Sequence, residues 1–110
     1  MKTIYLSGPM TGYTNYNFDK FNEEAAKLRE KGFAVINPAE NFGGYPDLPR
    51  TIYMRSDFFS VLQADIVVVL PGWEQSSGAR AEVILAQEIG TPVEDLEGRT
   101  LEQEVHTLVL

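Results

Sequence analysis

The hydrophobic pattern of the chain switches repeatedly between the period of strands and the period of helices. Residues 66–70 form an unbroken apolar run of β-branched residues and one leucine, which is typical of a strand buried on both faces. Pro71 and Gly72 end this run. Shorter extended segments with glycine or proline near their ends are expected as further strands, at 3–6, 33–37 and 91–93.

Segments in which the apolar residues have helical spacing lie between these strands. A first helix is expected to start after Asn17, which can cap it, and to end at Gly32. A third helix is expected to open at Ser76 and to run to about Ile89. The apolar stripe of the first helix consists of Phe18, Phe21, Ala25 and Leu28. A second helix is expected over 51–64, with apolar contacts from Phe58, Phe59, Val61 and Leu62.

Two segments are less regular. Residues 38–50 contain three prolines and a Gly-Gly pair, which predicts a long loop that serves either as a binding loop or as a plain connector. Thr100 and Gln103 have the spacing of a capping box, which predicts a short amphipathic helix at the C-terminal end. Its apolar side would carry Leu101, Val105 and Leu108, with His106 on the polar side.

Alternation of strands and helices predicts a parallel sheet with right-handed crossovers. We expect one domain over 1–110 with an α/β, flavodoxin-like (Rossmann-like) three-layer sandwich and a four- to five-stranded parallel sheet in the order 2-1-3-4. Ligands bind such sheets where the strand order reverses, here between the first and third strands. The residues expected to meet at that crevice are Tyr5, Ser7, Ser76, Gly78 and Glu82.

Glu82 is the strongest candidate for chemistry at this crevice. It lies four residues after Gly78, so both share one helix face, and side chains tilt toward the N-terminus of a helix. Gly78 has no side chain to block the carboxylate, and the helix N-terminus favours its ionised form. A sheltered, ionised carboxylate can act as a nucleophile. The alternative is an ordinary solvated helix glutamate.

The composition of the chain limits the classes of partner and of metal site that it can have. The 110 residues carry a net charge of −7 without a basic stretch, which argues against duplex nucleic acid or a membrane surface as the partner. The chain has no cysteine and one histidine, so we expect neither a thiolate nor a histidine-rich metal site. No apolar run approaches the length of a membrane span, and we expect a cytoplasmic protein.

Three segments resemble a known superfamily. The sequences IYLSGP at 4–9, ADIVV at 64–68 and SSGARAE at 76–82 are similar to the nucleoside 2-deoxyribosyltransferase-like superfamily. That group includes deoxynucleoside 5′-monophosphate N-glycosidases and small phage-associated proteins of unknown function. The resemblance covers about residues 3–92 and implies a flavodoxin-like fold, a homodimer or larger homo-oligomer, and a nucleoside or nucleotide as the ligand.

The resemblance also implies roles for individual residues. Glu82 falls on the family's nucleophile, Tyr5 on the tyrosine that orients it, and Asp57 on the acid that protonates the departing base. Ser76 stands where the monophosphate hydrolases have a phosphate-binding serine and the transferases an aspartate. The residues expected to bind substrate are Ser7, Gly8, Pro9, Met10, Arg55, Trp73, Ser76, Ser77 and Gly78.

The function that the resemblance implies is cleavage of the N-glycosidic bond of a (deoxy)nucleoside 5′-monophosphate, with release of the free base. Such chemistry needs neither a metal nor an organic cofactor, so we expect none. The alternatives are a 2-deoxyribosyltransferase that exchanges bases, and a non-catalytic nucleotide-binding or sensor module. The first loop lacks the arginine that the monophosphate hydrolases carry there. The residues do not identify the base, and they leave ribose and deoxyribose open.

Overall fold

The computed structural model describes residues 1–44 and 48–102, with the side chains of 42–44 left out. Thr100 forms an antiparallel bridge with Glu94. The rest of the predicted C-terminal helix, including Gln103, Val105, His106 and Leu108, lies outside the described residues.

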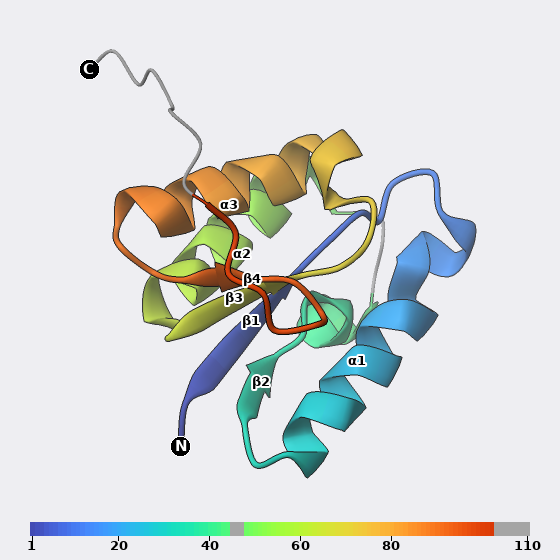
Figure 1. The fold of residues 1–110 in the computed structure, drawn as a ribbon. Helices are drawn as coiled ribbons and strands as arrows, with labels where there is room; N and C mark the ends of the chain where they lie inside the picture. The colour runs from blue at the N-terminus through green and yellow to red at the C-terminus, as the bar shows by residue number, and fades with distance from the viewer. Residues whose placement is uncertain (45–47, 103–110) are drawn as a thin grey trace.

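Four parallel strands form one sheet in the predicted order β2-β1-β3-β4 (Figure 1). In chain order they are β1 (Thr3–Ser7), β2 (Ala34–Ile36), β3 (Ile66–Val69) and β4 (Val93–Glu94). β1 lies beside β3 with Ser7 opposite Val69, so the carboxyl ends of these two strands are level. The strand order reverses between them, and a binding crevice is therefore expected at that edge.

Helices cover both faces of the sheet, which makes the three layers of a flavodoxin-like α/β fold (Figure 1). α1 (Phe18–Glu30) lies on one face, and α2 (Arg50–Gln63) and α3 (Ser77–Glu88) lie together on the other. Alternate strand residues point to opposite faces. On the α1 face the core contains Ile4, Leu6, Phe21, Ala25, Val68 and Leu70, and on the α2–α3 face it contains Tyr5, Val61, Val67, Val69, Val83, Ala86 and Val93.

The entrance to α1 differs from the prediction. Asn17 precedes the helix but makes no side-chain cap, because its backbone is left-handed at φ 63° and its side-chain amide donates to the Pro9 carbonyl at 3.0 Å. Asn15 and Tyr16 are also left-handed, at φ 49° and 53°. Such a run is unusual for residues other than glycine, and it turns the chain sharply ahead of α1.

Two further expectations need correction. Residues Pro38–Gly44 form 3₁₀ turns, so the predicted loop is partly regular. Phe59 and Leu62 were expected to supply apolar contacts, but they are 62% and 58% exposed, because only the Val61 side of α2 packs on the sheet and α3.

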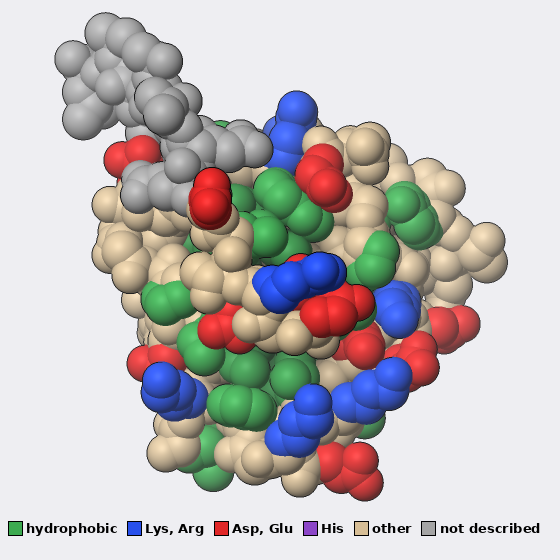
Figure 2. All heavy atoms as spheres, viewed as in Figure 1, with side chains coloured by type: hydrophobic (Ala, Val, Ile, Leu, Met, Phe, Trp, Pro, Cys, Tyr) green, Lys and Arg blue, Asp and Glu red, His purple; other side chains and the backbone are tan. Residues whose placement is uncertain are grey.

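The surface carries charges of both signs. Figure 2 shows Lys and Arg side chains interspersed with Asp and Glu on the viewed face, where no continuous basic surface is visible. Within residues 1–44 and 48–102, no helix combines the length and the apolar character needed to cross a bilayer.

Candidate active site

A cavity of about 630 Å³ opens at the carboxyl ends of β1 and β3, at the point where the strand order reverses. The loop after β1, one face of α2 and the first turn of α3 form most of its wall. Of the predicted site residues, those that line it are Tyr5, Gly8, Pro9, Met10, Asp57, Ser76, Ser77, Gly78 and Glu82. The sequence therefore located the crevice correctly.

Glu82 lies at the wall of this cavity and is only 5% exposed. Its two carboxyl oxygens each accept one hydrogen bond from β1. The Ser7 hydroxyl donates to Oε1 at 2.6 Å, and the Tyr5 hydroxyl donates to Oε2 at 3.0 Å. Tyr5 and Ser7 are two positions apart on a strand, so both side chains face α3. Strand and helix together hold the carboxyl group from two sides.

Asp57 reaches the same place from α2. The charge of its carboxyl acts on both the Glu82 carboxyl and the Tyr5 hydroxyl, so the three side chains lie close together. The side-chain amide of Asn41 donates to Asp57 Oδ1 at 3.4 Å. The structure thus brings together Tyr5, Asp57 and Glu82, which the sequence places on three different elements.

Burial dominates the electrostatics of this cluster. Burial, with the charge of Asp57 as a second cause, raises the pKa of Glu82 to about 8, although the Ser7 and Tyr5 hydrogen bonds act in the opposite direction. Burial raises the pKa of Asp57 to about 6. Burial and the two carboxyl groups raise the pKa of Tyr5 well above its usual value. Between pH 6 and 8 the carboxyl pair therefore holds one proton.

This result corrects one expectation about Glu82. The N-terminus of α3 was expected to favour the ionised carboxyl, but burial raises the pKa of Glu82 to about 8. The argument from Gly78 also changes. A Cβ at Gly78 would lie 3.6 Å from Met54 Sδ, an ordinary contact, so the glycine is not needed to make room for Glu82.

The N-terminus of α3 forms a polar end of the cavity. The Ser76 hydroxyl oxygen caps the helix by accepting the Ala79 amide at 3.2 Å, which leaves its own proton free to donate. Arg50 Nη2 donates to Ser77 Oγ at 3.1 Å. Arg50 is the first residue of α2 and lies seven residues before Asp57, so both lie on one helix face. A guanidinium and a helix N-terminus side by side suit an anionic group.

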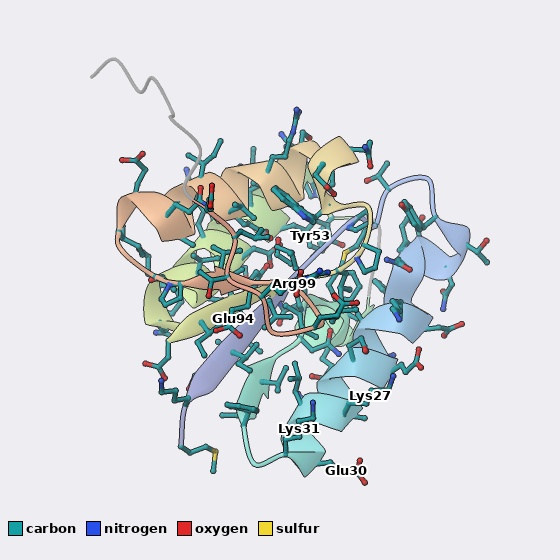
Figure 3. All side chains as sticks on the ribbon, in the orientation of Figure 1. Lys27, Glu30, Lys31, Tyr53, Glu94 and Arg99 are labelled. Carbon is teal, nitrogen blue, oxygen red and sulfur yellow. The ribbon has the colours of Figure 1, made fainter. Side chains whose placement is uncertain are left out.

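Aromatic side chains form another part of the wall. Tyr13, Tyr16 and Phe18 all line the cavity, and the Tyr16 and Phe18 rings lie 5.8 Å apart. Tyr53 also lines it from α2 and accepts the Leu48 amide at 3.3 Å (Figure 3). Flat ligand rings stack well on such side chains.

The loop that follows β1 packs closely against the loop after β3. The Tyr13 hydroxyl lies so near Gly72 that a Cβ at that glycine would be only 2.5 Å away. Gly72 also has a φ of +89°, so both its conformation and its surroundings require a glycine. This contact fixes one side of the cavity entrance.

Three predicted substrate-binding residues do not line the cavity. Arg55 is exposed, because it lies about half a turn of helix away from Tyr53 and Asp57 and points to the other side of α2. Trp73 packs instead against the core on the α2–α3 face. Ser7 is 1% exposed and gives its hydroxyl proton to Glu82.

Sequence reasoning missed several residues that do line the cavity, namely Tyr13, Tyr16, Asn41, Arg50 and Tyr53. The helical period could have identified the two on α2, because 50, 53, 54 and 57 share one face. Within the part of the chain that the structure describes, no group of three or more His, Cys, Asp or Glu side chains could hold a metal ion.

Solved structures with a similar fold include two 2-deoxyribosyltransferases. The enzyme from Bacillus psychrosaccharolyticus is 22% identical with a TM-score of 0.68, and the match covers 84% of this chain and 70% of that one. The enzyme from Leishmania mexicana is 17% identical with a TM-score of 0.68, over 86% of this chain and 63% of that one. These matches confirm the resemblance in fold noted above.

A third similar structure is a conserved protein from Enterococcus faecalis V583. It is 23% identical with a TM-score of 0.71, and the match covers 86% of this chain and 62% of that one. The chain thus spans less than two thirds of two of these three proteins.

Comparison of sequences gives a family but no curated relative. No curated protein matches the chain. The family model described as a domain of unknown function (DUF4406) matches residues 2–95. The match includes the whole sheet, Glu82 and the two groups that surround it, Tyr5 and Asp57. The chain therefore belongs to the DUF4406 family of domains of unknown function.

Proposed function

We propose that this chain cleaves the N-glycosidic bond of a (deoxy)nucleoside 5′-monophosphate, with Glu82 as the nucleophile. One observation carries the proposal: a buried glutamate at the wall of a ligand-sized cavity, with a hydroxyl on each oxygen and the charge of a second carboxyl acting on it. A nucleophile and an acid at one cavity are the two parts that retaining glycoside cleavage requires.

The reaction proceeds in two displacements. In the first, a carboxylate oxygen of Glu82 forms a bond to the anomeric carbon while the carbon–nitrogen bond breaks, and its electrons leave with the base. Asp57 gives its proton to the departing nitrogen. In the second, water attacks the anomeric carbon, Asp57 takes a proton from the water, and the carbon–oxygen bond to Glu82 breaks. The products are a free base and a sugar phosphate.

The single proton of the carboxyl pair must move for the first step. Glu82 has the higher pKa of the two, whereas attack needs Glu82 ionised and Asp57 protonated. The two carboxyls titrate as a pair, so the proton can pass from one to the other. Tyr5 stays protonated throughout, since its pKa is raised, and so it remains a donor to Glu82.

Two parts of the cavity wall suit the two ends of a nucleotide. The 5′-phosphate would lie at the N-terminus of α3, where Ser76, Ser77 and Arg50 offer donors. The base would stack against the aromatic wall that includes Tyr16 and Phe18. Glu82 and Asp57 lie on the wall of the same cavity and would face the bond between sugar and base.

Base exchange by a 2-deoxyribosyltransferase is the second candidate. Two proteins with a similar fold carry that name. The two reactions share the first displacement and differ in whether water or a second base accepts the sugar. A panel of nucleosides and 5′-monophosphates, each with and without a second base, separates them by chromatography. Release without an added base supports the hydrolase, and release that requires one supports the transferase. No release from any compound contradicts both and favours the binding module.

Arg50 should determine the preference for phosphate. Arg50→Ala is expected to raise KM for a 5′-monophosphate by roughly 10- to 100-fold, the value of a charge-assisted hydrogen bond, and to leave KM for the corresponding nucleoside unchanged. Arg55→Ala is the matched control, because it removes the same charge from the exposed side of the same helix. Steady-state kinetics on both substrates test this. An equal rise in KM for the monophosphate in Arg50→Ala and Arg55→Ala would contradict the assignment of Arg50 to phosphate binding.

A further inference from the structure

Ser7 occupies a buried position from which its hydroxyl donates to Glu82. Its backbone is fixed inside the sheet, opposite Val69 and with its carbonyl accepting the Leu70 amide at 2.8 Å. Its side chain is buried, and its hydroxyl donates to Glu82 Oε1 at 2.6 Å, shorter than the 3.0 Å bond from Tyr5 to Oε2.

We infer that Ser7 is a second positioning residue for Glu82, whose hydroxyl holds the carboxylate in the attacking orientation and stabilises the charge that returns to it when the sugar leaves. This inference rests on the proposed function. Tyr5 and Ser7 each bind one oxygen, so the carboxyl group cannot turn about its last bond without breaking one of the two hydrogen bonds.

The two displacements depend on Ser7 to different degrees. In the first, Glu82 loses its negative charge as the ester forms, so a donor to the carboxylate assists orientation but opposes the loss of charge. In the second, the ester carbon–oxygen bond breaks and the charge returns to the carboxylate, which the Ser7 hydroxyl stabilises directly. Loss of that hydroxyl should therefore slow the second displacement more than the first.

The kinetic test uses Ser7→Ala, which removes the hydroxyl and little volume. We expect kcat to fall roughly 10- to 100-fold. We expect kcat/KM to fall less, because kcat/KM reports the steps up to base release and the second displacement comes after that release. Rapid-quench measurements should then show a burst of free base equal to the enzyme concentration. Ser60→Ala is the matched control, since its hydroxyl donates to the Ser56 carbonyl on the same helix. An active Ser7→Ala without a burst would overturn the inference.

A second readout does not depend on turnover. The carbon-13 signal of the Glu82 carboxyl, assigned with Glu82→Gln, reports its titration. Tyr5 on β1 and Asp57 on α2 are the described titratable groups that act on Glu82, and neither is altered. Ser7→Ala is expected to raise the pKa of Glu82 by about 1 above the wild-type value, and Ser60→Ala to leave it unchanged.

The two readouts separate failure of this inference from failure of the proposed function. A wild type that releases no base contradicts the function, while the titration still tests the contact between Ser7 and Glu82. An unchanged pKa of Glu82 in Ser7→Ala overturns the inference whatever the activity. If Ser7→Ala does not fold, Ser7→Cys has nearly the same size with a weaker donor, and a smaller rise in the pKa of Glu82 is the expected result.

Discussion

Glu82→Gln is expected to reduce base release from 5′-monophosphates by at least about 10⁴-fold, because an amide cannot form the ester to the anomeric carbon. The fold should be retained. Glutamine has the same shape, its carbonyl can accept one of the two β1 hydroxyls, and its amide can donate to the other. Chromatography of released base measures the loss, and thermal unfolding checks the fold.

Glu88→Gln is the control for this experiment. It makes the same change of charge on the same helix, at an exposed position, and should retain full activity. Glu82→Ala should lose as much activity as Glu82→Gln, since no water can replace a covalent nucleophile. A folded Glu82→Gln that still turns over within a factor of about ten of wild type would exclude the nucleophilic role.

The second large effect is the dependence of folding stability on pH. Folding raises the pKa of Glu82 from 4.5 to about 8 and that of Asp57 from 3.8 to about 6. A carboxyl whose pKa is higher in the folded state destabilises that state once the pH exceeds the unfolded value. The cost grows until the pH passes the folded value. The wild type should therefore lose stability as the pH rises from about 4 to above 8, and Glu82 should account for the part above pH 6.

Glu82→Gln removes the larger share of this loss. At pH 9 the variant should exceed the wild type in unfolding free energy by on the order of 3 kcal/mol, or roughly 10 °C in Tm, and the difference should vanish near pH 4. Denaturant titrations at several pH values measure it, with Glu88→Gln as the exposed control. Parallel stability curves for wild type and Glu82→Gln would show that the Glu82 carboxyl is not desolvated in the folded protein. Such a gain in stability with loss of activity is common at active sites.

Much of the fold followed from local patterns. The apolar run of β3 and the stripe of α1 were read correctly because their periods depend on neighbouring residues only. The strand order followed from general rules of parallel sheets, and it placed the crevice between β1 and β3. The convergence of Tyr5, Ser7 and Glu82 on that crevice followed in turn. The hydrogen bond from Ser7 to Glu82 did not, since Ser7 was expected to bind substrate.

The parts that could not be predicted depend on tertiary packing. The rotation of α2 about its own axis determines that Arg50 lines the cavity and Arg55 does not. The sequence does not show which side of this helix meets the sheet. The left-handed turn at Asn15 and Tyr16 has no glycine to reveal it. The raised pKa of Glu82 was missed for the same reason, because the depth of burial is a property of the assembled layers.

The covalent intermediate tests the central claim most directly. Wild-type protein mixed with a 5′-monophosphate is quenched in acid during turnover and digested with trypsin, which releases residues 81–99 as one peptide. Mass spectrometry should find the mass of a sugar phosphate on this peptide, with fragmentation placing it on Glu82, and should find none in Glu82→Gln. Turnover without this adduct, or with the adduct on Asp57, would contradict the role assigned to Glu82.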